Sequence, residues 1–405
     1  MIKDSYTLTA SEALAAIASG RLSSVELVKS CLARIAETDG AINAWAFMDE
    51  GAALAQAAEC DRIRIAGLAT GPLHGIPVAL KDIIDTAKMP TQRGSVIFEG
   101  RQTDHVARLV ELLREAGAVI MGKTVTTELA FVHANETRNP HNPDHTPGGS
   151  SSGSAAAVAA MHVPLAIGTQ TNGSVIRPAS FCGVFGFKPT RGVISRDGIL
   201  QTSVSLDQVG CFGRSLADVA LLTDAIGGYD QRDAVSFARP RPNMSAGAAA
   251  DAPVTPALAW FDLPFNDRLS DDALDGIDAV IEILGPSVER MAAADTLSDL
   301  VAVQATIHEY EIAQHQAEVF ETHWNQISDT LRPVITRART ITKAQYDDAL
   351  AVKTSAEGFF KAFFMDYDAI IAPSAAGEAP TFGNGTGDPI FCTLWTLAGL
   401  PCISL

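Results

Sequence analysis

Two spacings of hydrophobic residues divide the chain into helical stretches and short buried strands. Near the N-terminus, Thr9 with Glu12 and Ser23 with Glu26 each fit a capping box, in which a hydroxyl and a carboxylate satisfy free backbone N–H groups. The first pair predicts a helix that ends near Gly20. The second predicts an amphipathic helix that ends at about residue 37.

Further along, short apolar runs alternate with helical stretches. The runs predicted as strands are GIPVALK (75–81), AVIMGKT (118–124), PLAIGTQT (164–171) and ALAWFD (257–262). The stretches predicted as helices are DHVARLVELLREAG (104–117), SAAAVAAMH (154–162), SLADVALLTDAIGG (215–228) and residues 270–284. This alternation predicts an α/β fold, with a central mixed β-sheet covered by helices on both faces. We expect a single large domain over residues 1–405.

Residues 235–365 are predicted to form a variable, mostly helical excursion from that domain. The segment from about Arg239 to Pro256 is rich in Ala, Pro and polar residues, which is typical of a surface excursion. The last stretches, YDAIIAPS and FCTLWTLAGLPCISL, return to a composition typical of a core. The chain ends at Leu405 inside an apolar run, so a truncated C-terminus is one of the alternatives that the sequence leaves open.

The composition narrows the classes of partner. The net charge is −17, which disfavours nucleic acid and anionic membrane surfaces, because both need clustered Lys and Arg. The six cysteines form no C-x-x-C pair and are predicted to be reduced thiols. No signal peptide is recognisable, and no apolar run reaches the ~20 residues that span a bilayer. We therefore expect a cytoplasmic protein with no membrane partner.

Two motifs suggest other chemistry and are set aside. GAVIMGKT (117–124) matches the P-loop pattern, but its interior is apolar and predicted as the strand itself, so Lys123 is interpreted as a polar group at a strand end. GSSSG (149–153) matches the nucleophile elbow with Ser151 as nucleophile. An elbow needs a core strand directly before it, whereas TRNPHNPDHTPG contains three prolines.

A serine and lysine pair is the stronger candidate for nucleophilic chemistry. Lys81 ends an apolar strand, where desolvation would lower its pKa and allow the neutral amine to act as a base. TQTNGS (169–174) follows another strand and contains a tight turn whose backbone N–H groups can converge on an oxyanion. Ser174 ends that turn and could attack a carbonyl there. Taken alone, each segment also fits an ordinary structural role.

Taken together, three segments resemble the amidase signature family. GIPVALKDIIDT (75–86), NPHNPDHTPGGSSSGSAAAVAA (139–160) and GTQTNGSVIRPASFCGVFGFKPT (168–190) are similar to its lysine strand and its signature core. The resemblance is dense over about residues 20–228 and looser at the C-terminal end. Residues 235–365 match no pattern of the family. Members of the family usually continue several dozen residues past GLPCISL, which keeps the question of the C-terminus open.

The resemblance implies a Ser–cis-Ser–Lys triad and an amidase that forms an acyl-enzyme. Lys81 matches the base, Ser150 the bridging serine with a cis peptide bond before it, and Ser174 the nucleophile. The backbone N–H groups of residues 171–174 (Thr171, Asn172, Gly173 and Ser174) would form the oxyanion hole. Thr169 is expected to be a supporting hydroxyl. Ser152 and Ser154 are expected to stand behind the reacting groups or to cap a helix, and Gln170 is expected to stand behind the reacting groups.

The turn departs from the family's commonest pattern, G-T-D-T-G-G-S-I-R. Gln170 stands in place of Asp, Asn172 replaces a glycine, and Arg177 lies three residues after Ser174. Asn tolerates left-handed backbone geometry, so we expect the oxyanion hole to survive. The S-V-I-R-P run resembles the malonamidase-like branch, in which the arginine grips the carboxylate of a short half-amide. A structural ion pair of Arg177 with a buried acid is the equal alternative.

Several functions stay open beside the half-amide amidase. These are an aryl or indolyl acetamide amidase, an amidotransferase-complex subunit that needs partner subunits, and a catalytically silent family member. No cofactor is expected. No metal is expected either. The predicted partner is a small-molecule amide, with a homodimer as the expected oligomer.

Overall fold

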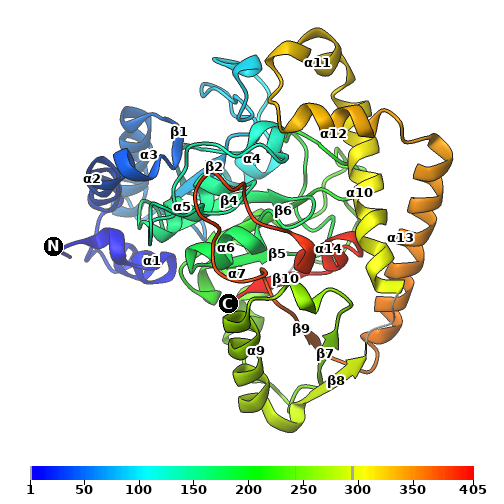
Figure 1. The fold of residues 1–405 in the computed structure, drawn as a ribbon. Coiled ribbons are helices and arrows are strands. Elements are labelled where there is room, and N and C mark those ends of the chain that lie inside the picture. Colours follow the sequence, from blue (N-terminus) through cyan, green and yellow to red (C-terminus); the bar gives the residue numbers. More distant parts are fainter. Residues whose placement is uncertain (1, 242, 293–295) are drawn as a thin grey trace.

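A mixed sheet of seven strands forms the centre of the protein (Figure 1). The computed structural model describes residues 2–241, 243–292 and 296–405. The sheet has the strand order β1-β3-β2-β4-β6-β5-β10. Its strands are β1 (Trp45–Met48), β2 (Pro77–Lys81), β3 (Val119–Thr124), β4 (Leu165–Gln170), β5 (Phe185–Lys188), β6 (Gln208–Gly213) and β10 (Cys402–Ser404).

The neighbouring strands β3, β2 and β4 run parallel, and all other neighbouring pairs of this sheet are antiparallel. Every residue of these three strands is buried. Since successive side chains of a strand point to opposite faces, both faces of the sheet are covered. The parallel arrangement brings the carboxyl ends of β2 and β4 to the same edge, where Lys81 and Thr169 lie.

The helices fall into groups around this sheet. Those of the first half are α1 (Ala10–Ala18), α2 (Ser24–Ile42), α3 (Glu50–Ile65), α4 (Arg108–Glu115), α5 (Ser152–Ala159), α6 (Ile176–Cys182) and α7 (Leu216–Ile226). Helix α5 packs across β2, β3, β4 and β6, and α6 packs beside it over β5 and β10. The small side chains of α5, mostly Ala, Ser and Gly, allow this close packing.

The region 235–365 contains more than helices. Strands β7 (Leu258–Asp262) and β8 (Val288–Ala292) join β9 (Ala369–Ile371) in a separate parallel sheet of three strands. Strand β7 lies within the predicted strand ALAWFD, but the sequence did not indicate β8 or the separate sheet. The helices of the second half are α8 (Met244–Ala249), α9 (Asp271–Leu284), α10 (Thr296–His315), α11 (Ala317–Thr322), α12 (Leu331–Ala338), α13 (Lys343–Phe363) and α14 (Ile390–Leu397). The long helices α10 and α13 lie side by side along one flank (Figure 1).

Two predictions from the local sequence need adjustment. Both capping boxes are present, but α2 continues to Ile42 because nothing in residues 37–42 breaks it, and Asn43 in the left-handed conformation ends it. Lys123 lies next to last in β3, at the strand end as predicted, but the sequence did not indicate its burial. Its side chain is fully buried in β3, where Nζ donates to the Ile84 carbonyl and to Thr91 Oγ1. None of the described helices combines the length and apolarity that a bilayer crossing requires.

Candidate active site

Lys81 and Ser150 meet at the carboxyl end of β2. Lys81 Nζ lies 2.7 Å from Ser150 Oγ and 2.9 Å from Thr169 Oγ1, and it donates a hydrogen bond to each. The Lys81 side chain is fully buried, and Ser150 and Thr169 are buried as well. The peptide bond between Gly149 and Ser150 is cis. The sequence predictions for these three side chains therefore converge on one point of the structure.

Main-chain contacts on both sides fix the position of Ser150. Its carbonyl accepts hydrogen bonds from Thr127 N at 3.2 Å and Thr126 Oγ1 at 3.1 Å. The carbonyl of Gly149 accepts one from the Arg177 guanidinium at 2.7 Å. Because both flanking carbonyls are held, the Ser150 hydroxyl has little freedom to leave Lys81.

The charged form of Lys81 is disfavoured in this environment. Burial lowers the pKa of its amine to about 7, and the charge of Asp207 opposes this with a smaller effect. Asp207 is itself buried, and burial raises its pKa although Thr171, Thr202 and Ser203 donate hydrogen bonds to it. A substantial share of neutral Lys81 near pH 7 gives the site a base.

Ser174 lies in the turn between β4 and α6. Its side chain is partly exposed, and it makes no hydrogen bond within the part of the chain that the structure describes. In that same part, the backbone N–H groups of Asn172, Gly173 and Ser174 donate to no acceptor. A free hydroxyl therefore stands beside three free N–H donors, which is the arrangement that stabilises a developing oxyanion.

Gln170 and Gly173 shape this turn. Gln170 Oε1 accepts hydrogen bonds from Val175 N at 2.7 Å and Ile176 N at 3.0 Å, which satisfies the first N–H groups of α6. A Cβ on Gly173 would lie 3.0 Å from Pro389 Cβ, so glycine permits the approach of the segment that begins α14. Asn172 does not have a positive φ, so the turn keeps its shape without the left-handed conformation that we considered for it.

The other serines of the cluster serve the scaffold. Ser151 Oγ bonds both the N–H and the carbonyl of Thr169 at 3.2 Å, and its side chain is fully buried, which argues against a nucleophile elbow. Ser154 Oγ bonds Thr124 Oγ1 at 2.7 Å and donates to the Ile167 carbonyl at 3.0 Å. Ser152 begins α5 and is buried. Neither Ser152 nor Ser154 caps that helix.

Arg177 is buried but has no carboxylate partner within 4 Å among the described residues. Its two terminal nitrogens donate to the carbonyls of Gly149 and Gly387, and its Nε has no acceptor there. Burial lowers the pKa of the guanidinium to about 10, so it remains charged at neutral pH. The structural ion pair that we considered for Arg177 is therefore not formed.

A cavity of about 590 Å³ opens over Ser174, Asn172 and Arg177. Sequence reasoning missed most of its other lining groups, which come from α10, α12 and the segment before α14: Gln304, His308, Glu309, Arg337, Thr386, Gly387 and Asp388. Burial lowers the pKa of His308 to about 3, so its ring is neutral. Arg337 and Glu309 form an ion pair at this wall. The groups from α10 and α12 lie within residues 235–365, which matched no motif, so no sequence signal pointed to them.

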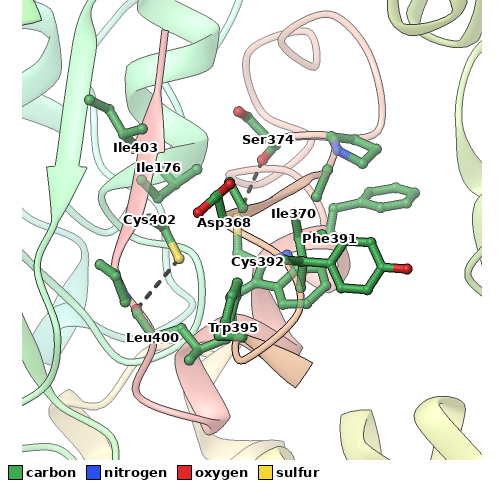
Figure 2. Close-up of a pocket in the computed structure, with 16 residues that line it drawn as sticks. Ile176, Asp368, Ile370, Ser374, Phe391, Cys392, Trp395, Leu400, Cys402 and Ile403 are labelled. Carbon is green, nitrogen blue, oxygen red and sulfur yellow. Dashed lines mark hydrogen bonds between the residues drawn. The ribbon is translucent and has the colours of Figure 1, made fainter. Parts of the chain in front are cut away.

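A second cavity, of about 500 Å³, lies between α14, β9 and β10 (Figure 2). Its wall is largely apolar and includes Ile370, Phe391 and Trp395. The thiols of Cys392 and Cys402 lie there, and burial raises the pKa of both, that of Cys392 to about 12. Because these thiols stay protonated, neither of them is an activated nucleophile. In the described residues, no cluster of His, Cys, Asp and Glu could hold a metal ion.

Comparisons with known proteins agree with this geometry. The family profile described as Amidase matches residues 26–405. The chain is 35% identical over 428 residues to a glutamyl-tRNA(Gln) amidotransferase subunit of Thermobifida fusca, covering 97% of this chain and 86% of that protein. It is 45% identical over 253 residues to the corresponding amidotransferase subunit of Acidothermus cellulolyticus, covering 61% and 50%.

Solved structures extend the match to the whole fold. One, described as a vestigial protein complex that reveals the evolutionary origins of an s-triazine catabolic enzyme, is 30% identical with a TM-score of 0.92, covering 98% of this chain and 90% of that one. The peptide amidase PAM in complex with chymostatin is 29% identical with a TM-score of 0.83, covering 98% and 90%. The chain therefore belongs to the amidase signature family of hydrolases.

Proposed function

We propose that this protein hydrolyses a carboxylic amide to an acid and ammonia or an amine, with Ser174 as nucleophile, Ser150 as proton relay and Lys81 as base. One observation carries the proposal. A fully buried lysine, whose amine has a pKa of about 7, lies 2.7 Å from a serine hydroxyl at the edge of the sheet from which the Ser174 turn emerges. A neutral amine in that position can accept the serine proton.

The proton transfers balance over both halves of the reaction. Neutral Lys81 takes the Ser150 proton, and Ser150 takes the Ser174 proton as Ser174 Oγ bonds the amide carbon. When the C–N bond breaks, Ser150 returns a proton to the leaving nitrogen and recovers one from Lys81. Water then gives up a proton by the same route and attacks the acyl-enzyme, which releases the acid and restores Ser174.

The N–H groups of the turn would stabilise the oxyanion in both steps. Asn172, Gly173 and Ser174 offer donors that no other group occupies in the described part of the chain, and Thr171 precedes them. Removal of one oxyanion donor in other hydrolases costs about 3–4 kcal/mol of transition-state stabilisation. The same donors would serve acylation and deacylation, since each passes through a tetrahedral oxyanion.

For the substrate class, we propose a short half-amide whose free carboxylate lies against Arg177. The guanidinium is buried in the wall of the Ser174 cavity and lacks a carboxylate partner among the described residues. A buried cation without a counterion favours an anionic ligand, because the ligand offsets the desolvation of the charge. An uncharged aryl or indolyl acetamide would leave that charge unpaired.

An amidotransferase subunit is the second candidate, and the similarity to the Thermobifida fusca protein over 97% of the chain favours it. The reacting groups would be the same, so the substrate separates the candidates. The net charge of −17 disfavours a direct contact with nucleic acid. Glutamine, used as the amide donor, is therefore the informative probe for this alternative.

The test is ammonia release from malonamate, propionamide, indole-3-acetamide, benzamide and glutamine, with Ser174→Ala beside the wild type. Release from malonamate that Ser174→Ala abolishes supports the half-amide amidase. Preference for propionamide or an aryl amide removes the role of Arg177, and preference for glutamine supports the amidotransferase alternative. No release from any amide by folded protein contradicts the proposal.

A further inference from the structure

One face of α10 contacts the loops that form the candidate active site. Gln304, His308 and Glu311 recur at the spacing of successive helical turns and so lie on the same face. His308 Nε2 lies 3.3 Å from Thr202 Oγ1, and Glu311 accepts hydrogen bonds from Ser205. Gln304 reaches the turn before Ser174. This face lies in the region where the sequence matched no family pattern.

Gln304 holds that turn by two hydrogen bonds. Its Nε2 donates to the Thr171 carbonyl at 3.1 Å, and its Oε1 accepts from Asn172 Nδ2 at 3.1 Å. Gln304 is only 3% exposed, so water cannot reach these groups. Loss of either bond would leave a buried donor or acceptor without a partner, which costs free energy. The side-chain amide of Gln304 thus binds the turn through one donor and one acceptor.

Helix α14 holds the same turn from another direction. Thr393 Oγ1 donates to Asn172 Oδ1 at 2.7 Å, and Thr396 Oγ1 donates to the Asn172 carbonyl at 2.5 Å. The carbonyls of Thr171 and Asn172 therefore both accept hydrogen bonds, whereas the N–H groups of the next residues donate to no acceptor among the described residues. Fixed carbonyls orient the following peptide planes, because each plane is rigid.

We infer that Gln304 is a positioning residue of the hydrolytic reaction, which orients the oxyanion N–H groups by holding the Thr171 carbonyl and the Asn172 side chain. The inference rests on the proposed function. It also gives Asn172 a role: a glycine at this position would offer Gln304 no amide to bind. Gln304 and Asn172 act as a pair, and the effects of replacing them are not additive.

Acylation by 4-nitrophenyl acetate tests this inference, with the burst of 4-nitrophenolate as the readout. Gln304→Leu is expected to lower the acylation rate constant by about 10- to 100-fold with little change in KM, because misplaced donors weaken only the transition state. Asn172→Gly removes one of the two Gln304 contacts and also the bond from Thr393, and it is expected to have a smaller effect. The double variant is expected to lose less than the product of the two single losses, because both variants remove the same Gln304–Asn172 bond.

Gln56→Leu is the matched control. Gln56 Oε1 accepts from Ile120 N at 3.1 Å and its Nε2 donates to the Ile120 carbonyl at 3.2 Å, so it holds a backbone segment of β3 in the same way. This control is expected to lose a similar amount of thermal stability and to keep the wild-type burst. Equal loss of the burst in both variants would assign Gln304 to general stability and overturn the inference.

Gln304→Glu keeps the size of the side chain. It is a second test of the inference that does not depend on the folding of Gln304→Leu. The carboxylate can accept from Asn172 but cannot donate to the Thr171 carbonyl, so acylation is slowed. Its rate relative to wild type is expected to rise on acidification, because the protonated carboxyl regains a donor. Wild-type acylation in folded Gln304→Leu, or a pH-independent ratio for Gln304→Glu, overturns the inference.

Ser174→Ala separates this inference from the proposed function. Loss of the burst in that variant is required before the Gln304 result is interpreted. A burst that survives Ser174→Ala contradicts the proposed nucleophile, and the inference falls with it. A burst that depends on Ser174 and is unaffected in the Gln304 variants contradicts only the role of Gln304.

Discussion

Lys81 Nζ and Ser150 Oγ lie 2.7 Å apart although 69 positions separate them in the sequence, and the lysine side chain is inaccessible to solvent. Burial holds the pKa of the amine at about 7, and only the neutral amine can accept a proton. We therefore predict that kcat/KM rises about tenfold per pH unit below pH 7 and levels off above it.

A pH–rate profile from about pH 5 to about pH 9, on whichever amide the wild type hydrolyses, measures this. Lys81→Arg is the companion variant, since a guanidinium stays protonated throughout and is expected to abolish activity at every pH. A profile that is flat from acid to neutral pH would exclude a titrating base.

Alanine variants of three serines, Ser150, Ser154 and Ser174, are expected to differ in their effect on catalysis. Ser174→Ala removes the nucleophile and should abolish acylation, and Ser150→Ala removes the relay and should lower kcat by about 10²–10⁴-fold. Ser154→Ala is the control, because among the described residues the Ser154 hydroxyl bonds only Thr124 and the Ile167 carbonyl. It should lower the melting temperature by a few degrees at roughly wild-type kcat. A loss of kcat in Ser154→Ala that exceeds the loss in Ser150→Ala would contradict this division.

Arg177 is predicted to discriminate between a charged and an uncharged amide. Malonamate and propionamide differ chiefly by a carboxylate, so the ratio of their kcat/KM values isolates that group. Arg177→Gln should lower the ratio by about 10- to 100-fold, since a charge-assisted bond of this kind contributes ~1.5–3 kcal/mol.

If Arg177 only supports the active-site backbone, the ratio of the two kcat/KM values is expected to respond differently. The guanidinium also bonds the carbonyls of Gly149 and Gly387 and could act only by holding Ser150. In that case both substrates lose the same factor, and the ratio stays constant.

A buried ion pair supports the loop behind the site. Arg196 bonds Asp233 through two nitrogens, at 2.8 and 3.1 Å, and also donates to the carbonyls of Val204 and Asp207. Both side chains of the pair are nearly inaccessible, at 3% and 1% exposed. We predict that Asp233→Asn lowers the free energy of unfolding by about 3–5 kcal/mol, because it leaves the arginine charge buried and unpaired.

The same pair predicts a pH dependence. Burial alone would raise the pKa of Asp233, but the hydrogen bonds and charge of Arg196 outweigh it and hold that pKa below its usual value. The stabilisation is complete above the unfolded pKa of about 3.9 and is lost as the pH falls through the lower folded pKa. Urea unfolding at several pH values measures it. Asp278→Asn, in the exposed pair with Arg290, is the control and should cost less than about 1 kcal/mol.

Local rules predicted much of the secondary structure. Capping boxes located the starts of α1 and α2, and apolar runs located β2, β3 and β4, because these signals involve residues within a few positions of each other. The family resemblance led to Lys81, Ser150 and Thr169, which the structure brings together. The burial of Lys123 could not be predicted, because its position in the strand says nothing about which groups cover the sheet.

The sequence by itself determined which residues could carry the chemistry: a lysine that ends an apolar strand, and serines in two glycine-rich turns. Tertiary structure alone decided the rest. Burial on all sides holds the amine of Lys81 near pKa 7, and Gln304 reaches Asn172 from 132 positions away. Desolvation and long-range hydrogen bonds depend on how helices and sheet pack in space, and no local spacing of residue types records that packing.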